Sequence, residues 1–311
     1  MSDESNVCFF GVPAMGSWKV RADQIATTRA RWYAAGNLEP YDILTHDVFC
    51  AVKRPFRNRL RLLQAMGKLC VYDVVDCWQQ PQDGLDHPDQ QAVRRFFEKF
   101  FAELPVDSVI FPNKTMHDDL GDLVPNPTFI YHHFWPGMEP IEVREQARIV
   151  GYQGAANYLG EWRPVIEQAC RRLGLEFVVN PADFRSIDIG FAARGGVHAS
   201  LMSHRYKSNV KLANFYGAGM PCLVNDEELA YHETDNGEVR YFRTAEELEE
   251  RLAELVDHDT RLRIHQKFLT TRKEYTLEAI AGQYEAWFAR LRRLVPVREV
   301  GPTGCYPVRP S

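Results

Sequence analysis

Two successive series of alternating strand and helix patterns constrain the fold more than any other feature of this chain. The first series occupies residues 7–131, and the second occupies 148–294. A strand, a helix and a second strand in parallel form the repeating unit of sheets that carry helices on both faces. The chain is therefore predicted to be an α/β protein with two Rossmann-like domains, each binding ligands beyond the carboxyl ends of its strands.

The two series define the predicted domains. The N-terminal domain is expected over 1–140 and the C-terminal domain over 147–279, because a polar stretch with prolines and glutamates separates them. A tail with several prolines and glycines follows over 295–311 and is expected to be partly extended or disordered. Two such domains facing each other would enclose a central ligand cleft.

Several elements of the first series are predicted from local patterns. A helix is expected over 18–35, a strand over 41–45, a helix from Pro55 to about Met66, and a strand over 69–75. In the second series, helices are expected over 158–173 and 245–256, with strands over 148–152 and 187–191. The alternation favours parallel rather than antiparallel sheets.

Composition excludes several classes of protein. The chain has 311 residues, of which 45% are hydrophobic and 25% charged, and these are globular values. No apolar run approaches the roughly 18 residues of a membrane span, and the polar first residues lack a signal-peptide pattern. The seven cysteines are scattered without a C-x-x-C pair, which indicates a reduced, cytoplasmic protein. We expect neither a transmembrane segment nor a metal site.

Charge limits the possible partners. The formal net charge is −5 and the pI is about 6.1, which argues against a wholly basic nucleic-acid binder. A local basic patch remains compatible with these values. Residues 53–61 contain one, described below.

The stretch 208–224 reads as a short helix, a glycine stop and a buried strand. Ser208 or Asn209 can cap the helix, and Gly217 and Gly219, followed by Pro221, are expected to end it. The start of a helix presents unpaired N–H groups and a partial positive charge. Arg205 and Lys207 precede this start and Lys211 lies in its first turn, so the sequence predicts a diphosphate site.

This pattern, Ser-Asn-x-Lys-Leu followed by Gly-x-Pro, resembles the donor-binding helix of retaining GT-B glycosyltransferases of the family 4-like group. The resemblance covers about 148–290 well and 1–135 more loosely. It implies a sugar nucleotide as co-substrate, with its diphosphate at the helix start and no cofactor or bound metal. It also implies that the helix over 280–294 packs back on the N-terminal domain.

One position departs from the family pattern. The family carries a glutamate that holds the ribose, and here Asn214 occupies its place. An amide can still bond a hydroxyl but carries no charge. The family's partner glutamate, eight positions earlier, is replaced by Tyr206.

Further donor-binding residues are predicted at the ends of strands. Arg194 follows the strand over 187–191 and precedes two glycines, and the resemblance implies a glycine loop at Gly154. In the N-terminal domain it implies that a loop with Gly11 and Gly16 approaches the sugar. For each charged residue alone, the alternative is an ordinary solvated surface position.

Two residues are candidates for catalysis. Asp76 falls where a strand ends, and a carboxylate there would orient or deprotonate an acceptor hydroxyl. His133 lies at the last strand end before the linker. The alternatives are a loop cap for Asp76 and a packed, hydrogen-bonded pair for His132 and His133.

A basic run offers an acceptor site. Arg54, Arg57 and Arg61 share one helical face by their spacing and follow a strand. Such a patch suits a phosphate-bearing acceptor, namely DNA, a phosphorylated glycan or an anionic membrane surface. The alternative is a charged outer face of an amphipathic helix.

These observations favour a glycosyltransferase that moves a sugar from a nucleoside-diphosphate sugar, by default UDP-glucose, to a hydroxyl acceptor with retention. One alternative is a phage-type DNA glucosyltransferase that modifies hydroxymethylated pyrimidines. A second is a noncatalytic sugar-nucleotide-binding protein of the same fold. A third is a sugar-nucleotide epimerase.

Overall fold

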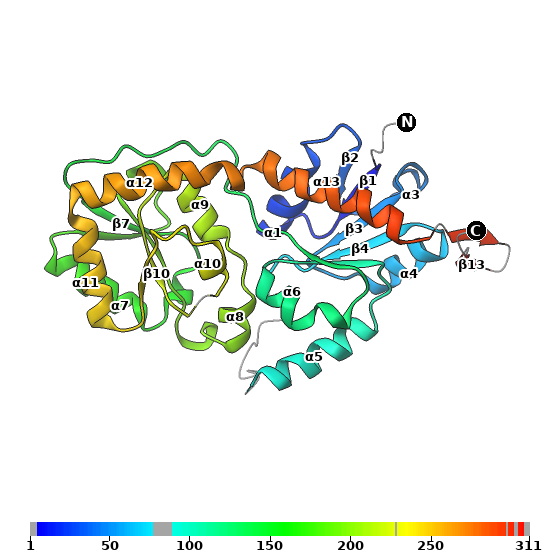
Figure 1. The fold of residues 1–311 in the computed structure, drawn as a ribbon, viewed down its shortest axis with the longest axis horizontal. Coiled ribbons are helices and arrows are strands. Elements are labelled where there is room, and N and C mark those ends of the chain that lie inside the picture. Colours follow the sequence, from blue (N-terminus) through cyan, green and yellow to red (C-terminus); the bar gives the residue numbers. More distant parts are fainter. Residues whose placement is uncertain (1–4, 77–88, 228, 297, 302–303, 308–311) are drawn as a thin grey trace. The chain divides into compact units, whose positions relative to one another are not determined.

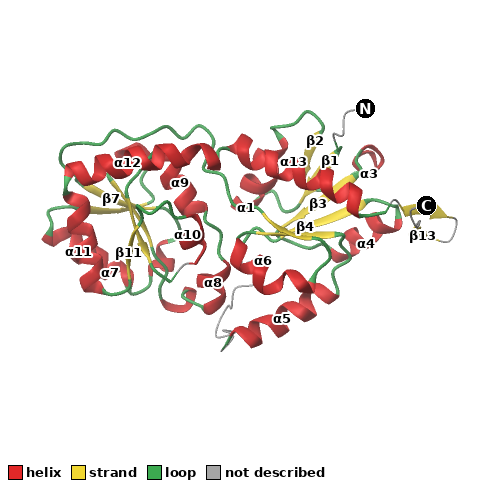
Figure 2. Ribbon diagram, viewed as in Figure 1, coloured by secondary structure: helices red, strands yellow, loops and turns green. Residues whose placement is uncertain are grey.

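The computed structural model describes residues 5–76, 89–227, 229–296, 298–301 and 304–307 (Figure 1). Packing divides these described residues into two units. The N-terminal unit holds the chain up to His132 together with Leu277 onward, and the C-terminal unit holds His133–Thr276. Each unit is a parallel sheet with helices, as the alternation of patterns predicts (Figure 2).

The sheet of the N-terminal unit has six parallel strands in the order β2-β1-β3-β4-β5-β6. They are β1 (Val7–Phe10), β2 (Trp32–Ala35), β3 (Val48–Val52), β4 (Leu69–Asp73), β5 (Ser108–Phe111) and β6 (Pro127–Phe129). The strand order reverses direction between β1 and β3, so this is the switch point where a parallel sheet binds ligands.

Helical segments connect these strands. They are α1 (Gly16–Trp18), the π-helix η1 (Lys19–Asp23), α2 (Gln24–Ala26), α3 (Pro40–Thr45), α4 (Arg57–Ala65), α5 (Gln90–Ala102), α6 (Lys114–Leu120) and the 3₁₀ helix η2 (Gly121–Leu123). The last helix of the unit, α13 (Leu277–Leu294), comes from beyond the C-terminal unit in sequence. It buries Ile280, Tyr284 and Phe288 against the sheet.

Two predictions for the first series are wrong. The expected helix over 18–35 ends by Ala26, and Trp32–Ala35 forms β2, an edge strand. The helix does not continue past this point, where the hydroxyls of Thr27 and Thr28 donate to the backbone carbonyls three residues back, at 2.7 Å each. The expected strand over 41–45 is the helix α3, because Glu39 and Asp42 form a capping box around Pro40.

The C-terminal unit has five parallel strands in the order β11-β10-β9-β7-β8. They are β7 (Ile149–Tyr152), β8 (Glu176–Val179), β9 (Ile189–Ala192), β10 (Cys222–Asn225) and β11 (Arg240–Phe242). Its helical segments are η3 (Ala156–Leu159), α7 (Trp162–Arg172), η4 (Phe184–Ser186), η5 (Gly196–His198), α8 (Leu201–Tyr206), α9 (Val210–Ala218), α10 (Leu229–Thr234), α11 (Ala245–Val256), α12 (His258–Arg272) and η6 (Lys273–Tyr275). The switch point of this sheet lies between β7 and β9.

In the tail, β12 (Arg298–Gly301) and β13 (Gly304–Pro307) pair as an antiparallel hairpin. The rest of the tail, residues 297, 302–303 and 308–311, lies outside the described residues. Among the helices of the described chain, none combines the length and the apolar character that a membrane crossing needs.

A fully buried ion pair joins four segments of the N-terminal unit. Arg21 of η1 and Asp73 of β4 form two parallel hydrogen bonds, Nε to Oδ2 at 3.0 Å and Nη2 to Oδ1 at 3.2 Å. The Tyr284 hydroxyl of α13 donates to the same carboxylate. Arg21 Nη1 also donates to the carbonyls of Ile130 and Tyr131, beyond β6, at 3.1 and 3.0 Å. All polar groups of the pair are thereby matched within the core.

Asp73→Ala is expected to lower the free energy of unfolding by about 3–5 kcal/mol, because it leaves the Arg21 charge buried without its partner. Chemical unfolding followed by fluorescence measures the change. Glu167→Ala is the control, since it removes a surface pair with Arg163 and should cost less than about 1 kcal/mol. Equal effects of the two substitutions would contradict the role given to the buried pair.

Candidate functional site

The candidate site lies at the switch point of the C-terminal sheet. Because all its strands are parallel, the segments that follow β7 and β9 leave the same edge. Gly160 of the first segment, with φ of +51°, packs against the backbone of Gly195 and Gly196 in the second. A Cβ on Gly160 would lie 2.4 Å from the Gly195 carbonyl carbon, so only glycine permits this contact.

The helix α9 begins beside these segments. Lys207, Ser208 and Asn209 immediately precede it and are all buried. Asn209 is the N-cap residue, but its side chain makes no capping hydrogen bond to the helix. The helix ends at Gly219, whose φ of +59° is the left-handed conformation that the sequence predicts for a glycine stop. The prediction that Gly217 also ends it is wrong, because Gly217 lies inside α9 and packs on the Phe134 ring. The predicted strand–helix–strand order around this helix is confirmed.

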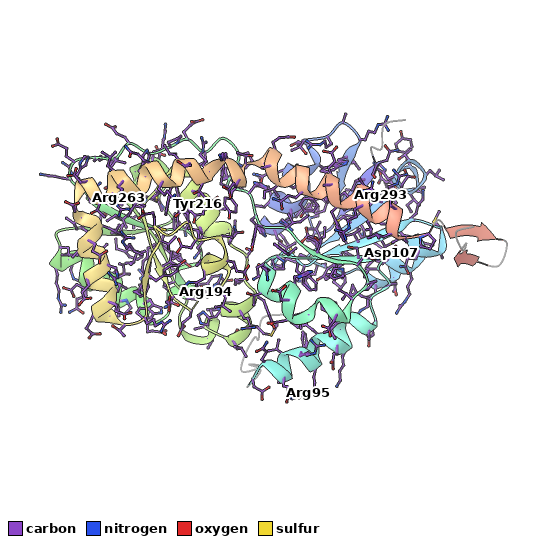
Figure 3. All side chains as sticks on the ribbon, in the orientation of Figure 1. Arg95, Asp107, Arg194, Tyr216, Arg263 and Arg293 are labelled. Atoms are coloured by element: carbon purple, nitrogen blue, oxygen red, sulfur yellow. The ribbon has the colours of Figure 1, made fainter. Side chains whose placement is uncertain are left out.

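Two cations of the predicted donor site lie over tyrosine rings. The Arg194 guanidinium carbon is 5.2 Å from the ring centroid of Tyr158, and Lys211 Nζ is 4.0 Å from that of Tyr152. Figure 3 labels Arg194 in this unit. The rings hold the cations in place by cation–π attraction while leaving their N–H groups to other partners. Arg205, in the last turn of α8, is half-buried.

Asn180 joins the segment after β7 to the one after β8. Its Oδ1 accepts from the Gly154 N–H at 2.8 Å, and its Nδ2 donates to the Gly154 carbonyl at 2.9 Å. Asn180 has φ of +51° and Gly154 has φ of +140°. The predicted glycine loop is thus held by a side chain from a neighbouring strand end.

A cavity of about 650 Å³ lies next to this loop, within the C-terminal unit. Its lining includes the aromatic side chains of Trp135 and Phe184, together with Gln153 and Asn214. Asn214 Oδ1 accepts a hydrogen bond from the Trp135 backbone N–H at 3.0 Å. The Asn214 amide therefore uses its acceptor atom on the protein itself.

His198, in η5, completes the cluster. Its ring packs edge-on against Tyr158, with centroids 4.4 Å apart. Burial, followed by the charges of Arg194 and Lys207, lowers the pKa of His198 below its ordinary value of 6.5.

The N-terminal unit positions its predicted residues at its own switch point. Gly11 follows β1 and packs on Trp18, since a Cβ there would lie 2.6 Å from the indole ring. Gly16 is exposed and begins α1. Asp76 follows β4 and forms an ion pair with Lys53 at 3.2 Å.

The two histidines differ in their surroundings. His132 is buried in the N-terminal unit, with Nε2 2.9 Å from the Val75 carbonyl oxygen. His133 is buried in the C-terminal unit, with Nδ1 2.7 Å from the Phe134 carbonyl oxygen. The two predicted catalytic residues, Asp76 and His133, thus belong to different units, and their catalytic roles stay predictions.

The basic run is distributed over several contacts. Arg57 forms an ion pair with Glu103 at 3.2 Å and lies over the Phe100 ring of α5. Arg61 Nη1 donates to Asn58 Oδ1 at 3.2 Å and is exposed. Arg54 is exposed and lies outside α4, which begins at Arg57 after the left-handed Phe56, so the prediction that all three arginines share one helical face is wrong. Acceptor binding by these three arginines stays a prediction.

Sequence reasoning missed most of the aromatic and amide residues of the site. They are Trp135, Tyr152, Tyr158, Asn180, Phe184 and His198. An available signal was their position, because nearly all lie within a few residues of a strand end on the ligand edge.

Comparisons with known proteins bear on the fold. No family model matches this chain, and no curated protein matches it. Among solved structures, it is similar to the GtfA/B complex, with a TM-score of 0.53, 11% identity and 79% of this chain covered. The chain spans 57% of that longer protein.

Two further similar structures are sugar-phosphate synthases by name. The α,α-trehalose-phosphate synthase (UDP-forming) from Burkholderia xenovorans has a TM-score of 0.55 and 9% identity, covering 82% of this chain and 79% of that one. Sucrose-phosphate synthase from Thermosynechococcus elongatus has a TM-score of 0.54 and 11% identity, covering 80% and 74%. The likeness shows that this chain has the GT-B glycosyltransferase fold of two Rossmann-like units, as the sequence predicts.

Asn180→Gly is expected to lower the free energy of unfolding by about 1–2 kcal/mol, because it removes two hydrogen bonds to Gly154 but keeps the left-handed backbone. Asn180→Ala should cost about 1 kcal/mol more, since alanine disfavours that conformation. Thermal unfolding of both variants measures the difference. If alanine were tolerated as well as glycine, the backbone conformation at this position would be unimportant.

Proposed function

We propose that this protein is a glycosyltransferase that binds a nucleoside-diphosphate sugar in its C-terminal unit and transfers the sugar to a hydroxyl acceptor. The convergence of Arg194, Lys207 and Lys211 on the start of α9, at the switch point of the sheet, carries this proposal. Helix amides and fixed cations stabilise a diphosphate, most of all when it leaves with the negative charge of the broken bond.

The cavity beside the site fits the nucleoside. Trp135 and Phe184 offer aromatic surfaces to a base, and Asn214 of α9 lies in the same lining. UDP-glucose is the proposed donor. Its support is the resemblance of the α9 sequence, together with a similar fold whose name contains "UDP-forming".

The proposed reaction proceeds with retention and without a metal ion. The bond between the sugar and the diphosphate breaks, and the acceptor oxygen attaches to the same face of the sugar. Arg194 and Lys211 stabilise the leaving diphosphate, which accepts the acceptor's proton. Asp76, held by Lys53 at 3.2 Å, is proposed to orient the acceptor hydroxyl.

The acceptor is proposed to be a sugar hydroxyl. An anionic acceptor has the support of two similar structures, one named in complex with glucose-6-phosphate and one named a sucrose-phosphate synthase. DNA receives less support, because Arg57 is already paired with Glu103. We further propose a cytoplasmic protein, since Cys8, Cys50, Cys70, Cys170 and Cys222 are all free thiols.

Thermal unfolding with UDP, GDP, ADP, dTDP and their glucose conjugates tests the proposal. A ligand at about 100 times its dissociation constant adds about 2.7 kcal/mol to the stability. Lys211→Met should weaken binding of the stabilising nucleotide about 10- to 100-fold, because it removes one charged contact to phosphate. Lys267→Met, on the exposed face of α12, is the control and should bind normally.

Failure of every nucleotide to stabilise the protein would overturn the proposal. Binding without slow hydrolysis of the sugar nucleotide would indicate the noncatalytic alternative. A changed sugar on an intact diphosphate would indicate an epimerase.

Asn214→Asp is expected to raise the preference for UDP over 2′-deoxy-UDP roughly tenfold. One carboxylate oxygen can keep the Trp135 N–H, while the other replaces an amide donor with an acceptor for ribose hydroxyls. Titration calorimetry with the two nucleotides gives the ratio for wild type and variant. An unchanged ratio would mean that this side chain does not face the ribose.

A further inference from the structure

We propose that His198 is a ligand of the donor diphosphate, neutral in the empty site and protonated in the complex, so that donor binding takes up one proton. The inference rests on the proposed function and deepens it by naming a pH-dependent contact in the same site. It concerns a residue that neither the sequence patterns nor the resemblance singled out.

His198 lies close to the cations of the candidate site. It ends η5, which follows β9 and Arg194 at the ligand edge, and its ring packs on Tyr158, the ring that also holds Arg194. Lys207, just before α9, is close enough to act on its charge. The imidazole therefore stands among the cations proposed to bind the diphosphate.

One hydrogen-bond contact bears on the protonation of His198. Its Nε2 lies 3.3 Å from Nδ2 of Asn157 in η3. With the amide in this orientation the nitrogen donates, Nε2 accepts and the ring is neutral, with its proton on Nδ1. Rotation of the Asn157 amide would present its carbonyl oxygen instead, and Nε2 would then bind a proton with a partner already in place.

The charges around the His198 ring disfavour its protonation in the empty site. The described groups beside the ring are the cations Arg194 and Lys207, the phenol of Tyr158 and the amide of Asn157. Glu161, the N-cap residue of α7, binds the backbone instead, because its Oε2 accepts the Gly196 N–H at 2.6 Å. A third positive charge is therefore disfavoured until a diphosphate arrives, and its negative charges reverse the balance.

The sign of the pH dependence follows. Binding raises the pKa of His198, so the added affinity is present at low pH and disappears as the pH rises through the pKa of the complex. A rise of about one pKa unit corresponds to about 1.36 kcal/mol, or up to tenfold in affinity. The diphosphate of a sugar nucleotide is esterified at both ends and does not itself titrate near neutral pH.

The test is titration calorimetry with UDP-glucose, or whichever sugar nucleotide stabilises the wild type, at pH 5.5 and pH 8. Two buffers of different ionisation enthalpy count the protons taken up. Wild type should bind about fivefold more tightly at the lower pH, with net proton uptake. His198→Asn should bind weakly at both values, whereas His198→Lys should bind tightly at both.

His258→Asn is the matched control, because His258 lies at the start of α12 beside Asp259 and not in the candidate site. This variant should keep the wild-type dependence of affinity on pH. Thermal unfolding confirms that each variant is folded. The inference is overturned, while the proposed function stays intact, if the wild type takes up no proton or if His198→Asn keeps the wild-type dependence of affinity on pH. A wild type that binds no sugar nucleotide at either pH overturns both.

Discussion

Within each of the two main sheets all strands are parallel, and this constraint determines where each unit can bind a ligand. Each segment that follows a strand leaves the same edge of its sheet, and the strand order reverses at one point in each unit. The segments after β7 and β9 leave the sheet there and meet where Gly160 packs on Gly195. Cations and aromatic rings therefore come together although they are up to about sixty positions apart in the sequence, as Tyr152 and Lys211 are.

Two cations of the candidate site lie over tyrosine rings. A tyrosine ring under Lys211 and another under Arg194 limit the movement of each side chain. An aromatic ring fixes the position of a cation without adding a negative charge of its own.

The sequence predicted the architecture because strands buried on both faces and glycine-ended helices leave clear patterns. It also located Lys211 and Asn214, since their spacing from Gly219 is fixed by a short helix. The sequence-based prediction failed at β2 and α3, where the hydrogen bonds of a single turn decide whether the chain forms a helix or a strand. Two threonine hydroxyls end the helix before Trp32, and the capping box at Glu39 overrides the apolar character of 41–45. Contacts between distant segments, such as Asn180 with Gly154, have no local signal at all.

The helix α13 has a consequence for how the chain folds during synthesis. Its residues complete the core of the N-terminal unit, and Tyr284 donates to Asp73 inside that core. Yet the ribosome makes α13 only after the whole C-terminal unit. The usual order, in which the first domain to emerge folds first, is therefore inverted here. The second unit can close while the first still has an exposed sheet face and a buried charge pair to complete, so nascent chains need protection until the last helix arrives.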